Sequence, residues 1–245
     1  MRIDVVVAIG PNKDNCDDSV LVNNRVFNNE SDSLNEEIKA VFVADGVGGS
    51  PGGKDASLFL LNEIRKVDFS QFDENDIRNK LKEINLSLIE SAHSIPGKEK
   101  MATTLTGILK GISGYYMVHI GNTRMYFKQG NYLKQISTDQ TQYQSLLNMG
   151  RYVEAESCNK SVILGCFGGE NNSYIASLVV EKIEASRLPD MILLTSDGIH
   201  DALTIEEMEK IIVSSSTVED VRKLVDLATE KVSEDDKSVV IIRSR

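Results

Sequence analysis

Apolar residues recur with two different periods along the chain, and the first part of the sequence predicts strands followed by helices. Short apolar runs predict strands at residues 5–9, 19–22 and 41–44. The stretches 54–66 and 75–93 instead carry apolar side chains three and four positions apart, with polar residues between them. This spacing is typical of amphipathic helices that cover one face of a sheet.

The middle of the chain has the pattern of an antiparallel meander, with turns that contain glycine and asparagine. Its four short β-rich runs occupy residues 103–108, 115–120, 124–128 and 132–136. The C-terminal part predicts a strand at 191–195, helices at 205–213 and 218–232, and a last strand at 238–242. Because strands cluster and helices come in pairs, this order favours an α+β layered sandwich over a doubly wound parallel sheet. No repeat or linker-like tract divides residues 1–245, so we expect a single domain.

Composition and charge narrow the class of protein. The chain has 245 residues, and 37 Asp and Glu against 27 Lys and Arg give a formal net charge of −10. Such a charge disfavours binding to nucleic acids or to anionic membranes. No apolar run approaches the roughly 20 residues of a membrane span, and charged residues interrupt the apolar start of the chain. Three cysteines without metal-type spacing suit a reducing compartment, so we expect a cytoplasmic monomer.

Aspartates lie at the ends of several predicted strands. Asp17 and Asp18 precede the second strand, Asp45 follows the third, Asp197 follows the strand at 191–195, and Asp235 precedes the last one. If these ends meet, two carboxylates about 4 Å apart repel each other by roughly 4 kcal/mol at an effective dielectric constant near 20. Raised pKa values or hard divalent cations such as Mg²⁺ or Mn²⁺ would relieve this repulsion. For any single Asp-Gly pair, an ordinary turn is the favoured interpretation.

Six short segments in chain order resemble the motifs of one family, the metal-dependent protein phosphatases of type 2C. The matching segments are residues 13–19 for R-x-x-N-E-D, 45–49 for D-G-x-G-G, 102–105 for G-T-T-L, 121–124 for G-D-S-R, 196–201 for S-D-G-x-x-D and 235–238 for D-N-x-[ST]. Each match is weak alone, but six in order over nearly the whole chain form a specific signal. The departures from the motifs mark a divergent, bacterial-type member.

The resemblance implies a fold and a reaction. The fold is a four-layer α-β-β-α sandwich, in which two central antiparallel sheets are flanked by helix pairs. The reaction is hydrolysis of phosphoserine and phosphothreonine on proteins, by in-line attack of a water that bridges two Mn²⁺ or Mg²⁺ ions. The implied partners are a phosphorylated protein substrate and a serine/threonine kinase or its targets.

The resemblance also implies roles for individual residues. Asp45 would bridge both metals, and the Gly46 carbonyl would bind one of them. Asp197 and Asp235 would bind the other metal and would be catalytic together with Asp45. Asp18 would act in the outer shell, through metal-bound waters. For Asp17, an outer-shell role and that of a surface acid remain alternatives.

Several departures from the family motifs affect the expected site. Lys13 replaces the arginine that grips the substrate phosphate, and it lacks the bidentate fork of arginine. A solvated loop lysine is the alternative for this position. Asn122 replaces an aspartate that helps to hold a third metal together with the acid at Asp201, so we expect that third site to be weak or absent. These changes, with Asp17 for glutamate, motivate a second hypothesis, a weak or silent relative that acts as a phosphoprotein-binding regulatory module. Retention of the three catalytic aspartates argues against this hypothesis.

For two further features of the sequence, a structural role is favoured over a functional one. The segment between Asn148 and Leu164 would form a flap beside the site, with Arg151 and Tyr152 as candidate substrate contacts, although a solvated loop is favoured. His119 alternates with apolar neighbours in a predicted strand. A buried structural histidine is therefore favoured there over a catalyst.

Overall fold

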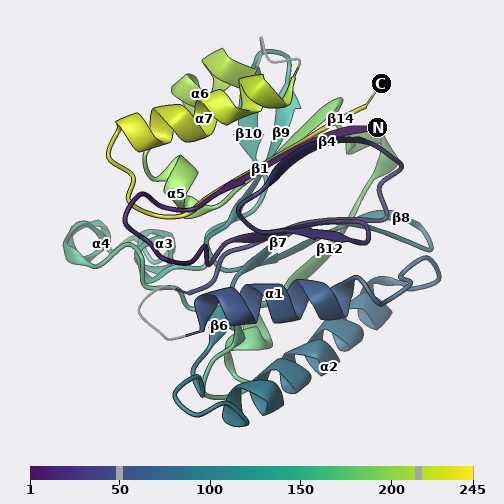
Figure 1. The fold of residues 1–245 in the computed structure, drawn as a ribbon, viewed down its shortest axis with the longest axis vertical. Helices are drawn as coiled ribbons and strands as arrows, with labels where there is room; N and C mark the ends of the chain where they lie inside the picture. Colours follow the sequence, from purple (N-terminus) through teal and green to yellow (C-terminus); the bar gives the residue numbers. More distant parts are fainter. Residues whose placement is uncertain (48–51, 213–216, 245) are drawn as a thin grey trace.

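Two six-stranded antiparallel sheets lie face to face at the centre of the computed structural model, which describes residues 1–47, 52–212 and 217–244 (Figure 1). Within these residues, the first sheet has the order β10-β9-β13-β14-β1-β4 and the second the order β12-β8-β7-β5-β2-β3. The strands of the first sheet are β1 (Arg2–Ala8), β4 (Ser31–Asn35), β9 (Arg124–Gln129), β10 (Tyr132–Gln135), β13 (Met191–Thr195) and β14 (Lys237–Arg243). Those of the second are β2 (Ser19–Val22), β3 (Arg25–Phe27), β5 (Ala40–Ala44), β7 (Leu105–Gly111), β8 (Gly114–Ile120) and β12 (Val179–Ile183). A short pair joins β6 (Ala102–Thr103) to β11 (Phe167–Gly168).

Helices cover the outer face of each sheet, so the predicted four-layer α+β sandwich is confirmed (Figure 1). The second sheet is covered by α1 (Gly53–Ile64) and α2 (Glu74–His93), and the first by α5 (Asp197–His200), α6 (Ile205–Ile212) and α7 (Val218–Glu230). Asp73 starts α2 by accepting hydrogen bonds from the backbone N–H groups of Asn75 and Asp76, and Thr217 caps α7 in the same way. These caps satisfy backbone donors that have no partner inside the helix.

Strands buried on both faces explain why the apolar runs are continuous. In β5, Val41 and Val43 point into the core between the sheets, whereas Phe42 and Ala44 point toward α1 and α2. In β1, Val5 lies in the core between the sheets. A strand whose alternate side chains enter two different cores needs apolar residues at every position.

The predicted meander in the middle of the chain is wrong. β7 and β8 pair in one sheet, but β9 and β10 belong to the other, where β9 also pairs with β13. The turn between β8 and β9 therefore carries the chain from one sheet to the other. Gly121 in this turn has φ +103°, and a Cβ there would lie 2.5 Å from the Thr104 side chain, so the crossing requires glycine.

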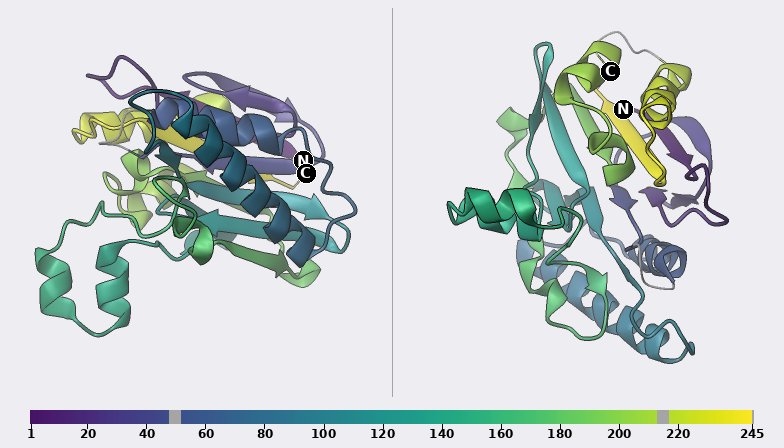
Figure 2. Two further views of the ribbon diagram at one scale, coloured as in Figure 1. Left: turned by 90° about the horizontal axis from the view of Figure 1, so that it is seen from below. Right: turned by 90° about the vertical axis from the view of Figure 1, so that its left-hand side faces the viewer.

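The predicted flap between Asn148 and Leu164 contains one short helix, at whose start Arg151 and Tyr152 are exposed, and a second short helix ends at Asn148. Two short helices, α3 (Gln142–Asn148) and α4 (Tyr152–Ser157), stand away from the body of the molecule (Figure 2). Short 3₁₀ helices follow at Tyr174–Ser177 and Ala185–Arg187. None of the helices within the described ranges combines the length and apolar character needed to span a membrane. The predicted helix end at Val213, and Gly48 and Gly49 of the D-G-x-G-G segment, lie outside the described residues.

Candidate active site

Four acid-bearing strand ends meet at one edge of the sandwich. Asp18 and Asp45 flank the paired positions Ser19 and Ala44 of β2 and β5, so the second sheet brings these two acids together. In the first sheet, β13 pairs with β14, and the Ser196 N–H donates to the Ser238 carbonyl at 3.1 Å. That pairing places Asp197, just after β13, beside the start of β14, which Asp235 and Asp236 precede.

A serine hydroxyl joins the two halves of this acid set. The Ser196 hydroxyl donates to Asp18 Oδ2 at 2.6 Å and accepts from the Ser238 N–H at 2.8 Å. Asp18 and Ser196 are both buried. Because these residues come from different sheets, the hydrogen bond fixes the spacing of the sheets at the acids. Ser196 is the first residue of the S-D-G-x-x-D segment, but the sequence predicts no role of its own for it.

The charges of these carboxylates interact strongly. Burial raises the pKa of Asp45 well above its usual value, and the neighbouring charges of Asp197, Asp18 and Asp235 raise it further. Burial also raises the pKa of Asp18 to about 7 and that of Asp197 to about 6. Mutual repulsion of this kind requires that the acids lie close together. The structure therefore brings together Asp18, Asp45, Asp197 and Asp235, as the strand-end positions predict.

Asn122 and Asp201 lie on the side of the site formed by the first sheet. The Asn122 side-chain amide donates to Asp197 Oδ2 at 2.9 Å, and Asn122 is buried. Asp201 and Asp197 line a cleft of about 300 Å³, together with Asp235 and with Ser161 of the flap segment. Asn122 thus contacts a carboxylate of the proposed two-metal site.

Glycines allow the chain segments of the site to approach one another. A Cβ at Gly46 would lie 2.4 Å from the Gly53 carbonyl oxygen, at the start of α1. A Cβ at Gly198 would lie 2.0 Å from the Asp236 carbonyl oxygen, beside β14. Both separations are too short for any side chain, so these two positions of the Asp-Gly motifs require glycine for packing.

Asp17 contacts the first turn of α1. Its Oδ1 atom accepts from the Lys54 N–H at 3.0 Å, and its carbonyl accepts from the Ser57 hydroxyl at 2.7 Å. A carboxylate at a helix N-terminus satisfies a backbone donor and interacts favourably with the helix dipole. Asp17 therefore anchors α1 next to the acid set.

Lys13 contacts acids from the start of β14. Its ammonium lies 2.6 Å from Asp235 Oδ1, 2.9 Å from Asp236 Oδ2 and 3.6 Å from Asp17 Oδ2. Asp236 is buried and also accepts the N–H groups of Gly10 and Asp17, both at 2.7 Å. Asp236 is the second residue of the D-N-x-[ST] segment, where the motif has asparagine. The only available signal for its central position was its adjacency to Asp235.

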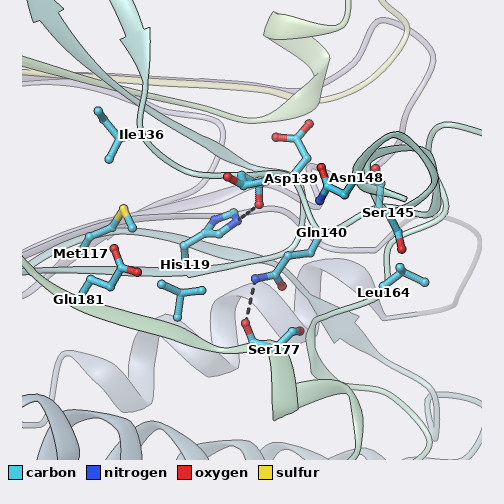
Figure 3. Close-up of a pocket in the computed structure, with 13 residues that line it drawn as sticks. Met117, His119, Ile136, Asp139, Gln140, Ser145, Asn148, Leu164, Ser177 and Glu181 are labelled. Atoms are coloured by element: carbon cyan, nitrogen blue, oxygen red, sulfur yellow. Dashed lines mark hydrogen bonds between the residues drawn. The ribbon is translucent and has the colours of Figure 1, made fainter. Parts of the chain in front are cut away.

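A second hollow lies between the sheets at the base of the flap (Figure 3). It has a volume of about 380 Å³, and His119 and Gln140 lie at its centre. The His119 ring nitrogens contact the Thr106 hydroxyl and the Thr138 carbonyl, both at 2.8 Å, which agrees with the structural role favoured from the sequence. The Gln140 side chain donates to the Ser177 carbonyl and accepts from the N–H of Gly121, which directly precedes Asn122. Gln140, which lines this hollow, therefore also holds the turn that carries Asn122.

The donor set suits hard divalent cations. Carboxylate oxygens are the ligands that Mg²⁺ and Mn²⁺ prefer, and a cation would relieve the repulsion that raises the pKa values of Asp18, Asp45 and Asp197. Asp18 Oδ1 is buried and has no hydrogen-bond partner among the described residues. Among the residues that the structure describes, no group of three or more Asp, Glu, His or Cys side chains is already arranged to hold a metal ion. Lys13 and Asn122 instead donate to the carboxylates of Asp235 and Asp197.

Comparison with known proteins identifies the family. The sequence model of protein phosphatase 2C matches residues 12–232. The chain belongs to the protein phosphatase 2C family. The family resemblance predicted from the six motifs is thereby confirmed.

Individual members of the protein phosphatase 2C family resemble the chain over most of its length. It is 27% identical to the serine/threonine protein phosphatase PstP of Mycobacterium tuberculosis over 87% of this chain, but it spans only 42% of the length of that relative. It is 29% identical to the serine/threonine phosphatase stp of Listeria monocytogenes, over 80% of this chain and 78% of the relative. A crystal structure of the PstP catalytic domain in complex with two manganese ions superposes with a TM-score of 0.74 at 24% identity, covering 98% of each chain.

Proposed function

We propose that this chain is a metal-dependent protein phosphatase that hydrolyses phosphoserine and phosphothreonine. The observation that carries the proposal is the convergence of Asp18, Asp45, Asp197 and Asp235 at one edge of the sandwich. Phosphoryl transfer needs little covalent chemistry from the protein, but it needs concentrated, well-placed positive charge. A crowded acid set provides that charge indirectly, by holding metal ions. Membership of the protein phosphatase 2C family supports the same reaction.

The proposed cofactors are two Mn²⁺ or Mg²⁺ ions, and two manganese ions are named for the structure of the PstP catalytic domain. Asp45 and the Gly46 carbonyl, together with Asp197 and Asp235, would hold them. When bound, such ions stabilise negative charge on the phosphate and supply a nucleophilic water of lowered pKa. We assign Asp18 and Asp17 to supporting positions around this set, because both acids are also tied to protein donors.

Other residues of this chain hold the carboxylates in place. Asn122 donates to Asp197 Oδ2, and the Ser196 hydroxyl donates to Asp18 Oδ2, so one oxygen of each carboxylate is fixed by a protein donor. Orientation of ligands by neighbouring hydrogen bonds is a general requirement of metal sites. The proposal includes no third metal, since the Asn122 amide is bonded to Asp197 and Asp201 is exposed.

The proposed substrate is a phosphorylated protein, and the proposed partner is a serine/threonine kinase or its targets. The naming of relatives as serine/threonine phosphatases supports this substrate class. The cytoplasmic location and the monomeric state expected from the sequence stay predictions.

The test is hydrolysis of p-nitrophenyl phosphate and of a phosphothreonine peptide, with Mn²⁺ and with excess chelator. We expect turnover of both substrates that requires Mn²⁺, and calorimetry should give two bound Mn²⁺ ions per chain. Mn²⁺ binding without turnover of either substrate would favour the regulatory module instead. Absence of Mn²⁺ binding would overturn both the cofactor assignment and the reaction.

A further inference from the structure

We infer that Lys13 is a positioning residue that pairs with Asp236, rather than the residue that grips the substrate phosphate. The Lys13 ammonium lies 2.9 Å from Asp236 Oδ2 and 2.6 Å from Asp235 Oδ1, and Asp17 Oδ2 lies 3.6 Å away. Lysine has three N–H donors and no acceptor. In this structure, its charge therefore faces the carboxylates of its own chain.

Asp236 is the centre of this arrangement. Only 2% of its surface is exposed, and its two oxygens accept from the Gly10 N–H, the Asp17 N–H and the Lys13 ammonium. The first two bonds attach the segment before β2 to the start of β14. That segment carries Asp17 and Asp18, and the start of β14 follows Asp235, so Asp236 connects acids that belong to different sheets.

A buried carboxylate needs a cation close to it. Burial of an unpaired charge is costly, and removing one partner of a buried pair leaves that cost uncompensated. Lys13 is partly buried, with 30% of its side chain exposed, and it provides that cation for Asp236.

This pairing explains two departures from the family motifs as one change. The motif residues at these positions are arginine and asparagine, and this chain has Lys13 and Asp236. Aspartate adds a negative charge that asparagine lacks, and the compact ammonium of lysine compensates it at 2.9 Å. The inference rests on the proposed function only where it concerns phosphate binding, because the pair itself is a structural feature.

The test is a double-mutant cycle of Lys13→Met and Asp236→Asn, measured by thermal denaturation in excess Mn²⁺ and again in chelator. We expect each single substitution to lower Tm by about 4–8 °C, because each breaks a mostly buried charge pair. The double variant should lose at least about 3 °C less than the sum of the two. Lys13→Arg keeps the positive charge, so its Tm should stay close to that of the unmodified chain. Additive losses would overturn the pairing.

A matched control is the pair of Lys98 and Asp55, whose charged atoms lie 2.5 Å apart and whose lysine is about as exposed as Lys13, but whose carboxylate is 47% exposed. The cycle of Lys98→Met and Asp55→Asn should show small, additive changes in Tm, because exposed ion pairs contribute little to stability. A coupling as large as that of Lys13 and Asp236 would mean that the assay reports net charge rather than the buried pair, and would overturn the inference.

The affinity for inorganic phosphate distinguishes a positioning role of Lys13 from direct binding of phosphate by Lys13. Inorganic phosphate is titrated calorimetrically into the Mn²⁺-loaded protein and its Lys13→Met variant. We expect affinities within about threefold of each other, whereas loss of a direct charged contact to phosphate costs about tenfold or more. A tenfold loss would return Lys13 to the phosphate-binding role. If the unmodified, Mn²⁺-loaded protein neither binds phosphate nor hydrolyses a phosphopeptide, the proposed function fails, while the Tm cycle still decides whether Lys13 and Asp236 are paired.

Discussion

Gly198→Ala should damage metal binding more than it damages the fold. The new Cβ would lie 2.0 Å from the Asp236 carbonyl oxygen, whereas ordinary contacts begin near 3.4 Å. The start of β14 and α5 must therefore separate by about 1.4 Å. Overpacking of this kind costs about 2 kcal/mol, which lowers Tm by about 4–8 °C. The same movement separates Asp235 from Asp197, so we expect Mn²⁺ affinity to fall at least about tenfold.

Gly107→Ala provides the matched control. Gly107 lies within β7, and its added Cβ would also lie 2.0 Å from a backbone carbonyl oxygen, that of Val41. Thermal denaturation should therefore show a loss of Tm similar to that of Gly198→Ala. Calorimetry of the folded protein should give a Mn²⁺ affinity within about twofold of the unmodified chain, because the clash at Val41 in β5 lies four residues before Asp45, whereas the clash of Gly198→Ala lies directly beside Asp197 and Asp235. Equal Mn²⁺ affinities for the two variants would refute the link between Gly198 packing and the acid set.

Three other predictions concern a proposed metal ligand, the pH dependence of metal binding and a buried ion pair. Asp197→Asn should lower kcat for p-nitrophenyl phosphate at least about 100-fold, because it removes a ligand charge that no neighbour replaces, and an unchanged rate would contradict the assignment. Burial raises the pKa of Asp18 to about 7 and of Asp197 to about 6, so these carboxyls hold protons below those values and Mn²⁺ must displace them. Mn²⁺ affinity should thus fall as the pH falls from about 7.5 to about 5.5, and calorimetry in buffers of different ionisation enthalpy should detect proton release; an affinity independent of pH would count against the raised pKa values. Arg124→Met breaks the fork-like pair with Asp139, in which Nε and Nη2 lie 2.9 and 2.6 Å from the carboxylate, and should lower Tm by about 5–10 °C. Arg124→Lys should recover less than half of that loss, because lysine lacks the fork, and full recovery would show that charge alone matters.

The strands that carry the acids were predictable because they are buried on both faces. In β5 and β13, every position is buried, so the apolar run is continuous and its end is visible in the sequence. The positions of Asp45 and Asp197 relative to those ends followed directly. The sequence did not predict with certainty that Asp45 and Asp197 meet at one edge. The pairing of strands from distant parts of the chain depends on tertiary packing, which a local sequence pattern does not determine.

The edge strands β4 and β12 and the short helices α3 and α4 could not be predicted, because they bury few apolar residues. β4 has the sequence Ser-Asp-Ser-Leu-Asn, and Leu34 is its only buried residue, so its hydropathy does not differ from that of a loop. β12 lies at the edge of the other sheet and likewise buries only Val180. At and beside the flap, α3 has no buried residue and α4 buries only Ala155, so neither helix has an apolar stripe. A strand or helix that buries little leaves little trace in the pattern of apolar residues.

The division of the acids between two sheets would link the proposed metal binding to the stability of the sandwich. Asp18 and Asp45 belong to the sheet under α1, whereas Asp197 and Asp235 belong to the sheet under α7. The sheets are held at this edge by the Ser196–Asp18 hydrogen bond and by the contacts of Asp236. Ions bound by acids from both sheets oppose separation of the sheets, and at 100 times the dissociation constant such binding adds about 2.7 kcal/mol to stability. Without metal, repulsion among the same acids acts in the opposite direction, so this edge should be the first part of the sandwich to open.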